Sequence, residues 1–445
     1  MRGLAISLGF VAGVALLAAC GGGGGTNGNI PSGGATSGPT SSSAPTSKPT
    51  NVPQSCNGSV ASTYTPAPNA SPLPAGIQVP PGFQIQVIAS LSSPRELAAL
   101  PNGDLLVGTG YAVMIIPNAE SSGAPGAPQA FFRFNNGPTE VSFAQSTCTV
   151  FVGTTTNVYA MPYHDGELVG PPSTPSPILA VRVSPTPSGR TDNDGHYTTS
   201  VAYSNGQLYV GIGSSCNACV EADPTRATIQ VMSPTGGPST MRAKDVRNPI
   251  AMAVNPATGS VWIGGAGQDD LPSEHPYEYM DPVSLEPNGA DYGWPNCEEN
   301  QHAYTAGYNC SNTVEPRVEI LAYSTIIGAT FYPTNEHGTY AFPAQYAGGL
   351  FVSAHGSWHD IHSGATCASP SQVDFVPMNG DTPKTPVNWN DPTAQWTPFV
   401  YGLQSPDCIA GDRSGRPTGV AVGSQGSLFL ADDKNGLVYR IRPIP

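Results

Sequence analysis

The chain has 445 residues, of which 52 are Gly and 47 are Pro, whereas charged residues make up only 11%. Few charges and many turn-forming residues argue against a helical protein and favour many short strands joined by tight turns. The net charge of −14, from 17 basic and 31 acidic residues, argues against nucleic-acid binding, because phosphate contacts require clustered positive charge.

Residues 1–19 are predicted to be a bacterial lipoprotein signal peptide. Arg2 supplies the positive charge, residues 4–17 form a short apolar run, and Leu-Ala-Ala precedes Cys20, which would become the lipidated first residue. The apolar run is too short and wrongly flanked for a membrane-spanning helix. The alternative is an ordinary secretory signal with an incidental cysteine. No Asp follows Cys20, which resembles the sorting signal for the outer membrane of Gram-negative bacteria, so we expect an anchor facing the periplasm or the cell surface.

The next segment, residues 20–75, consists mainly of Gly, Ser, Thr and Pro and has almost no aliphatic residues. Such a composition buries too little apolar surface to order itself. We therefore expect a disordered spacer between the lipid and a folded domain over residues 76–445.

The cysteines indicate disulfides. Without Cys20, eight remain, at positions 56, 148, 216, 219, 297, 310, 367 and 408. An even number in an exported chain favours disulfide pairing, which the sequence alone does not fix. Proximity and order suggest Cys297–Cys310 and Cys367–Cys408. The Cys216–Cys219 pair has the spacing of a redox or zinc motif, but in an exported domain a small disulfide loop is the more common outcome.

From Val79 onward one pattern recurs: an apolar segment, a turn that usually contains Gly, and a second apolar segment ending in small or polar residues. The copies span residues 97–109, 141–154, 199–214, 250–267, 328–357 and 418–433. Such strand–turn–strand units are typical of β-hairpins. Six of them predict an all-β protein, a six-bladed β-propeller in which each blade is a small antiparallel sheet.

A propeller places its ligands at one mouth of a central channel, on loops that leave equivalent strands. The candidate binding residues lie beside or between the repeats. They are Arg95, His196, Arg247, Gly267 to Asp270, His355 and Arg416. We therefore expect one rim to draw on successive blades.

Two of these positions suggest chemistry because of where they lie. Histidine is a common general base, and although a loop histidine bound to backbone is favoured for His196 taken alone, its position before the third repeat, shared with the family pattern below, favours the base. Arg247 precedes the fourth repeat and cannot lose its charge. It is followed by possible ligands of a hard cation, namely Gln268, Asp269, Asp270 and Glu274. This combination suits an anionic cofactor bound to a metal.

Several motifs resemble the soluble quinoprotein glucose/sorbosone dehydrogenase family over residues 79–445. They are GHYTTSVAYSNGQLYVGIGSSCNAC, RATI, VRNPIAMAVNPATG, DDLP, GADYGWP, AHGSW and GRPTGVAVGSQGSLFLADD, in the same order as in the family. The resemblance implies a six-bladed propeller that uses pyrroloquinoline quinone (PQQ) and calcium. Such proteins oxidise the C1 hydroxyl of aldoses or related aldehydes.

The resemblance also implies roles for single residues. His196 matches the histidine that takes the hydroxyl proton while hydride passes to the quinone C5. Arg247, with Asn248 beside it, matches the arginine that holds PQQ and polarises its C5 carbonyl. Two further positions, His355 and Arg416, would contact the cofactor, whose three carboxylates suit fixed arginines. The calcium ligands implied are Gly267, Gln268, Asp269 and Asp270.

Some positions depart from the family pattern. Thr198-Thr199 stands where related sequences have an arginine after the catalytic histidine. The acidic loop that begins at Gly267 is longer and more aromatic than in relatives, and His355 replaces a lysine near the cofactor. These differences leave the substrate and the affinity for PQQ open.

Other groupings indicate less. His355, His359 and His362 would cluster on a metal only in a helical turn, which Gly356 and Ser357 disfavour. The tryptophans are expected to pack within blades rather than to stack on sugar. These are Trp262, Trp294, Trp358 and Trp396. No GxGxxG motif opens an expected helix and no GxSxG motif occurs, so the sequence gives no support to nicotinamide dinucleotide binding or to serine-hydrolase chemistry.

Two functions are therefore weighed. The first is a lipid-anchored periplasmic PQQ oxidoreductase that passes electrons to a dye or to a periplasmic acceptor. The second is a non-catalytic propeller lipoprotein that binds a ligand or another protein. Because function belongs to a site rather than to a fold, the joint presence of His196, Arg247 and the loop from Gly267 to Asp270 favours the enzyme.

Overall fold

The computed structural model describes residues 56–68, 71–181, 195–269, 271, 277–298, 300–356, 369, 371–391, 393–404 and 413–444. These residues form strands β1–β29 and two short 3-10 helices, η1 (Gln145–Thr147) and η2 (Ala344–Tyr346). None of the helices found in them has the length and apolar character needed to span a bilayer.

Six antiparallel sheets form the blades. Blade 1 contains β2 (Leu97–Ala99), β3 (Leu105–Gly108), β4 (Ala112–Ile116) and β5 (Gln129–Arg133). Blade 2 contains β6 (Glu140–Ala144), β7 (Thr149–Gly153), β8 (Asn157–Pro162) and β9 (Leu179–Ala180). Blade 3 contains β10 (Thr199–Ser204), β11 (Gln207–Ile212), β12 (Thr228–Met232) and β13 (Thr240–Lys244), to which β17 (Ala290–Asp291) adds in parallel.

The second half of the ring follows the same plan. Blade 4 contains β14 (Met252–Val254), β15 (Val261–Gly265), β16 (Glu278–Asp281) and β20 (Val318–Ile320). Blade 5 contains β21 (Ile326–Phe331), β22 (Leu350–Ala354), β23 (Gln372–Val376) and β26 (Thr397–Val400). Blade 6 contains β27 (Pro417–Val422), β28 (Leu428–Asp432), β29 (Leu437–Pro443) and β1 (Phe83–Ser90). Two small ribbons, β18 (Cys297–Glu298) with β19 (His302–Ala303) and β24 (Met378–Asn379) with β25 (Thr382–Pro383), lie outside the blades.

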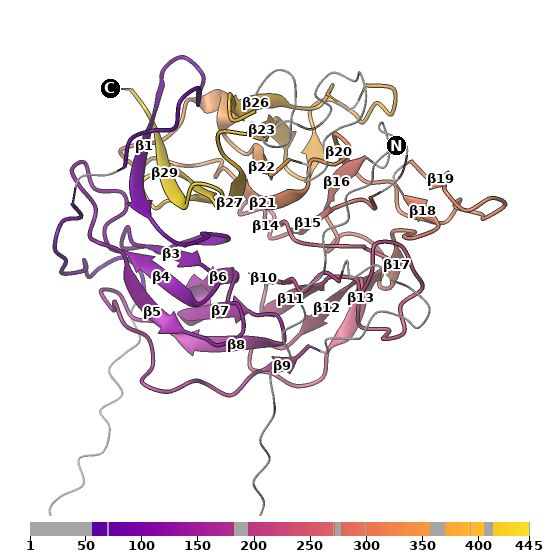
Figure 1. Cartoon of the computed structure of the whole chain (residues 1–445), viewed down its shortest axis with the longest axis horizontal. Coiled ribbons are helices and arrows are strands. Elements are labelled where there is room, and N and C mark those ends of the chain that lie inside the picture. The colour runs from indigo at the N-terminus through magenta and orange to yellow at the C-terminus, as the bar shows by residue number, and fades with distance from the viewer. Residues whose placement is uncertain are drawn as a thin grey trace, which may run out of the picture. The chain divides into compact units, whose positions relative to one another are not determined.

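The six-bladed propeller predicted from the repeats is confirmed. Each repeat supplies the first two strands of one blade, and the first strands contact one another in a closed circuit, β2–β6–β10–β14–β21–β27–β2 (Figure 1). The ring closes by pairing β1 antiparallel to β29, so the earliest strand of the chain completes the last blade.

Local sequence explains the hairpins. Between β10 and β11, Asn205 and Gly206 have φ values of 50° and 79°, the left-handed pair that a tight type I′ turn requires. The Gly at the end of the second strands β3 and β7 has a different reason. A Cβ on Gly108 would lie 2.3 Å from the Thr139 carbonyl oxygen, and one on Gly153 would lie 1.8 Å from that of Thr199. Neighbouring blades therefore approach each other through backbone at these glycines.

Part of the segment that was expected to be a disordered spacer is ordered. Within residues 56–68, Cys56 is joined to Cys148 by a disulfide, and Pro66 forms a β-bridge with Gly126. The Ser62 hydroxyl also donates to the buried carboxylate of Asp104. A polar segment with little apolar surface is thus held against blades 1 and 2 by a covalent bond and by hydrogen bonds. Cys20 and the preceding residues lie outside the described part of the chain.

The other disulfides follow the sequence more closely. Cys216–Cys219 and Cys297–Cys310 are both bonded, as expected. The Cys56–Cys148 pair was not predicted, because its partners are 92 residues apart. Cys367 and Cys408 fall outside the described residues. Three tryptophans are buried within the fold as predicted, Trp262, Trp294 and Trp396; Trp358 is not described.

Candidate active site at the channel mouth

The predicted site residues meet at one end of the inner strands. His196 and Arg416 precede the first strands β10 and β27, and Arg247 lies between β13 and β14. His355 follows the second strand β22, and Gln268 follows β15. Because the first and second strands of a blade are antiparallel, the start of one and the end of the other face the same mouth.

His196 is held by Ser214 on both its backbone and its ring. Its backbone N–H donates to the Ser214 carbonyl at 2.8 Å, and its Nδ1 lies 2.8 Å from the Ser214 hydroxyl oxygen. Burial lowers the pKa of His196 well below its ordinary value, and the positive charges of Arg247 and Arg226 lower it further. The ring is therefore neutral at physiological pH, as a proton acceptor must be.

Arg247 is buried and fixed by two partners. Its Nε donates to the Asn217 carbonyl at 3.0 Å, and its Nη2 donates to the Asn217 side-chain oxygen and to the Asp269 carboxylate, each at 2.9 Å. Asn248, the next residue, accepts a hydrogen bond from the Thr198 hydroxyl at 2.6 Å. Asn248 is thus bonded to the segment that contains His196, and Arg247 is bonded to the Cys216–Cys219 loop and to the loop that follows β15.

The predicted calcium loop is only partly suited to that role. Asp269, expected as a metal ligand, instead pairs with Arg247, because the arginine carries the nearest opposite charge. The side chain of Gln268 is 4% exposed, and its Oε1 is buried with no hydrogen-bond partner among the described residues. A buried oxygen without a donor fits a hard cation. Gly267 lies beside it, and Asp270 lies outside the described residues.

A second cluster forms where blades 5, 6 and 1 meet. His355 Nε2 lies 3.0 Å from the Asp433 carboxylate, whose other oxygen accepts from Arg95 at 2.9 Å. Arg416 donates to the His355 carbonyl at 3.2 Å and to the Gly356 carbonyl at 2.6 Å. Burial lowers the pKa of His355 to about 4, against the opposing effect of Asp433. His359 and His362 are outside the described residues, so the three-histidine cluster is not described.

A neutral carboxyl group links the two clusters. Glu278, at the start of β16, accepts hydrogen bonds from the Thr325 and Ile326 backbone N–H groups at 2.8 and 2.7 Å. The Thr325 carbonyl in turn accepts from the backbone N–H of His355 at 3.2 Å. Burial raises the pKa of Glu278 to about 8, although the nearby charge of Arg247 lowers it.

The two arginines retain binding capacity. Arg247 and Arg416 each use Nε and Nη2 in the bonds above, and neither donates through Nη1 to any residue that the structure describes. A guanidinium with spare N–H groups at a channel mouth suits a ligand that carries carboxylates. The donor set therefore fits a carboxylate-bearing cofactor.

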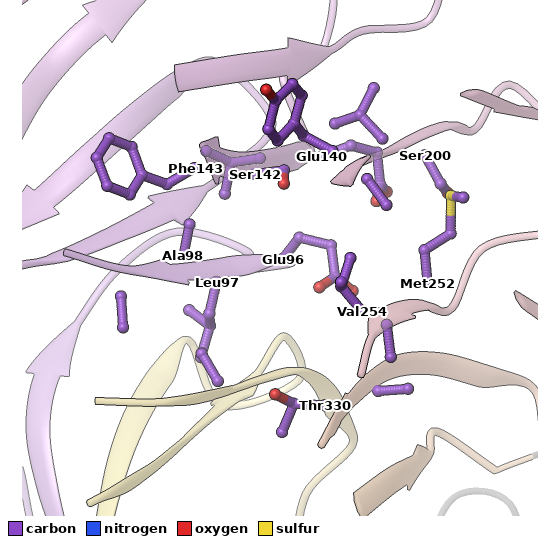
Figure 2. A pocket seen from close by; sticks show the side chains of 18 of the residues that line it. Glu96, Leu97, Ala98, Glu140, Ser142, Phe143, Ser200, Met252, Val254 and Thr330 are labelled. Carbon is purple, nitrogen blue, oxygen red and sulfur yellow. The ribbon is translucent and has the colours of Figure 1, made fainter. Parts of the chain in front are cut away.

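A cavity of about 380 Å³ lies between the inner strands of all six blades. Its lining includes Glu96, Glu140 and Ser200 rather than the predicted site residues, and Figure 2 shows the Glu96 carboxyl group among the lining side chains. Burial raises the pKa of Glu140 to about 7. Glu96 directly follows Arg95, so this acidic channel begins beside the second cluster.

Three site residues were not found from the sequence. Ser214 and Asn217 lie in and beside the Cys216–Cys219 motif, which we interpreted only as a disulfide loop. Asp433 ends the sixth repeat. The only signal in the sequence was their position at or after the second strand of a repeat. Their proximity to His196 or Arg95 is seen only in the structure.

Comparison with known proteins agrees with this architecture. The family model TrAA12-like matches residues 294–443. The iodide structure of a Trichoderma reesei protein of Carbohydrate-Active Enzymes Family AA12 is 19% identical, with a TM-score of 0.66, and covers 85% of this chain and 100% of that one. The holo form of the PQQ domain of a pyranose dehydrogenase from Coprinopsis cinerea is 16% identical, with a TM-score of 0.66, and covers 86% of this chain and 100% of that one.

A curated relative adds little about function. An uncharacterized protein of Borreliella burgdorferi is 24% identical over 239 residues, which are 53% of this chain and 57% of that protein. This match spans little more than half of either protein. At these identities the solved structures show that the chain shares the six-bladed fold of PQQ sugar dehydrogenases and AA12 proteins.

Proposed function

We propose that the protein is a PQQ-dependent oxidoreductase that oxidises an aldose or a related sugar aldehyde at C1. The observation that carries the proposal is a neutral, half-buried histidine, His196, fixed beside a buried arginine, Arg247, at the channel mouth. A general base must be neutral to accept a proton, and His196 meets this condition at neutral pH.

Different residues of the site bind the cofactor, bind calcium and accept the proton. Arg247 and Arg416 bind the cofactor's carboxylates through their unused N–H groups, and Gln268 Oε1 and the Gly267 carbonyl are the oxygens offered to calcium. When bound with calcium, PQQ supplies the acceptor for the hydride that leaves the sugar C1. His196 accepts the proton of the C1 hydroxyl, and its low pKa keeps it ready to do so across the neutral range.

One observation favours the second candidate, a propeller that binds a ligand without turnover. The guanidinium of Arg247 is already engaged by Asn217 and Asp269, which a purely structural arginine would also show. This candidate predicts that the site binds no quinone. It is separated from the enzyme by the experiment below.

The test is reconstitution of the full chain, purified in detergent, with PQQ and calcium. We expect a bound-quinone absorption spectrum and reduction of an artificial dye with at least one member of an aldose and aldehyde panel. His196→Ala should abolish dye reduction and leave the spectrum. His164→Ala, at a half-exposed histidine of blade 2, is the matched control and should leave both unchanged. Absence of a quinone spectrum together with absence of turnover would reject the enzyme.

We also propose that Cys20 carries a lipid that anchors the protein in the outer membrane, facing the periplasm or the surface, where a periplasmic acceptor collects the electrons. Metabolic labelling with a fatty acid tests the anchor. Label should enter the wild-type chain and be lost in Cys20→Ala; label that persists in the variant would contradict the assignment.

A further inference from the structure

The Cys216–Cys219 loop is the feature that the proposed function leaves unused. It follows β11 directly, and its four residues are closed by the disulfide. Both cysteines are buried against Trp294 and Ala227. Because the disulfide engages both sulfurs, this loop does not offer thiolate ligands to a metal.

The loop determines which nitrogen of His196 carries the proton. The Ser214 hydroxyl has a single hydrogen, and it donates this hydrogen to the Cys216 carbonyl at 2.7 Å. The same oxygen lies 2.8 Å from His196 Nδ1, so it can only accept there. In neutral His196 the proton must then reside on Nδ1, which leaves Nε2 with a free lone pair.

The same loop also fixes the arginine. The Asn217 carbonyl accepts from Arg247 Nε and from the Trp294 indole N–H, each at 3.0 Å. The Asn217 side-chain oxygen accepts from Arg247 Nη2 at 2.9 Å and from the Asp269 backbone N–H at 2.8 Å, while its amide donates to the Asp269 carbonyl at 3.1 Å. One asparagine therefore connects Arg247, Asp269 and Trp294.

Both contacts depend on carbonyls of adjacent residues, Cys216 and Asn217, inside one short covalent ring. A four-residue loop closed by a disulfide restricts the directions in which these two carbonyls can point. Ser215 reinforces the loop by donating to the Glu221 carboxylate through both its backbone N–H and its hydroxyl, each at 2.6 Å. The histidine and the arginine are thereby oriented by one element.

We propose that the Cys216–Cys219 disulfide loop is the positioning element of the site: through Ser214 it places the proton of His196 on Nδ1, and through Asn217 it directs the Arg247 guanidinium. The catalytic consequence rests on the proposed function: with the proton on Nδ1, Nε2 is the nitrogen that accepts the substrate proton. The tautomer of His196 and the effect of the loop on that tautomer do not depend on the proposed function.

The first experiment needs no cofactor. The side chains of the full chain are labelled with ¹⁵N-histidine, and the His196 signals are assigned by their loss in His196→Ala. We expect ¹⁵N chemical shifts of a neutral ring protonated at Nδ1 in the wild type. In Ser214→Ala, which removes the acceptor, we expect a shift of protonation toward Nε2. Protonation of wild-type His196 at Nε2 would overturn the proposal, whether or not the protein is an enzyme.

The second experiment separates the loop from general stability. The double variant C216S/C219S opens the loop, and C297S/C310S, which opens the disulfide beside the β18–β19 ribbon, is the matched control. We expect the first variant to lose the Nδ1 preference of His196 and, in the reconstituted protein, at least tenfold in kcat with a smaller change in KM. The control should keep the tautomer and kcat, even if its melting temperature falls.

The outcomes are distinguishable. A wild-type Nδ1 tautomer with no turnover would reject the proposed function and keep the positioning role. Turnover with a tautomer that is unchanged in C216S/C219S would keep the function and reject the loop's role. If C216S/C219S fails to fold, Asn217→Ala, which keeps the disulfide, should weaken PQQ binding at least tenfold, and unchanged binding would count against the proposal.

Discussion

The mouth of the channel contains two histidines, the half-buried His196 and the buried His355, which differ in the groups that hold them. His196 contacts a neutral hydroxyl, Ser214, whereas His355 contacts the carboxylate of Asp433, which also pairs with Arg95. Both rings have a lowered pKa, but for His355 burial and two arginines must overcome the carboxylate beside it. Neither ring carries charge at neutral pH.

The difference teaches what each partner contributes. A hydroxyl orients an imidazole without adding charge, so the remaining nitrogen of His196 keeps its capacity to accept a proton. The Asp433 carboxylate, which pairs with Arg95, instead fixes the neutral His355 ring by a hydrogen bond to Nε2. We therefore expect chemistry at the first histidine and ligand binding at the second.

The largest expected effect separates the two histidines directly. In the reconstituted protein, His196→Ala should lower kcat by about 10²- to 10⁴-fold, the usual contribution of a general base. His355→Ala should act mainly on cofactor affinity, with kcat at saturating PQQ reduced far less. Steady-state kinetics over a range of PQQ concentrations measures both. Equal losses of kcat in the two variants would remove the distinction.

The next largest effect compares how much Arg247 and Arg416 contribute to PQQ affinity. Arg247→Ala removes a cation from the His196 side, together with its ion pair to Asp269 and its hydrogen bonds to Asn217, so PQQ affinity should fall by more than tenfold. Arg416→Ala breaks bonds to two carbonyls and leaves Arg95 in place, so we expect a smaller loss. Equilibrium titration followed by quinone absorbance compares them. A larger effect of Arg416→Ala would mean that the second cluster dominates binding.

A smaller effect is expected for calcium binding near Arg247, and it can be tested with and without calcium. Gln268→Met removes the buried oxygen that has no hydrogen-bond partner among the described residues, and such an oxygen costs about 1–3 kcal/mol when it stays unpaired. The calcium-free variant should therefore melt at a higher temperature than the calcium-free wild type, and calcium should stabilise it less. Thermal unfolding with EGTA and with added calcium tests both expectations. Equal stabilisation by calcium in the two proteins would exclude Gln268 as a ligand.

The smallest effect concerns Glu278, which lies between the clusters. Its folded pKa of about 8 is above its unfolded value, so the folded state holds a proton that the unfolded state releases. Stability from this group is complete below the unfolded pKa and is lost as pH rises toward 8, by about 1.4 kcal/mol per pH unit. In Glu278→Gln the free energy of unfolding, measured by denaturation between pH 5.5 and 7.5, should fall less steeply. An unchanged slope would contradict a protonated Glu278.

The repeats predicted the fold well because each hairpin is a local pattern of apolar segments and a turn, as at Asn205-Gly206. They also located His196, Arg247, His355 and Arg416 at strand ends. The partners of these residues could not be predicted, because Ser214, Asn217 and Asp433 acquire their roles only from tertiary contacts. The pairing of Asp269 with Arg247 could not be predicted for the same reason, since it depends on how two loops meet.

Disorder was predicted for residues 20–75, and this prediction was wrong for residues 56–68. Residues 56–68 have the composition of a spacer, and composition reports how much apolar surface is available but not where a covalent bond will form. Cys56 pairs with a cysteine 92 residues away, which no local pattern encodes. A disulfide can therefore order a polar segment that hydrophobic burial alone would leave disordered.

The contact between Arg95 and Asp433 joins residues that are 338 positions apart, and β1 pairs with β29 at the same seam. The first blade of the growing chain thus exposes half of an ion pair until the sixth blade arrives. A nascent chain that has not yet supplied Asp433 lacks the second half of the mouth, whatever the state of blades 3 and 4. In the proposed enzyme, cofactor binding at this mouth therefore requires a closed ring and follows the synthesis of the sixth blade.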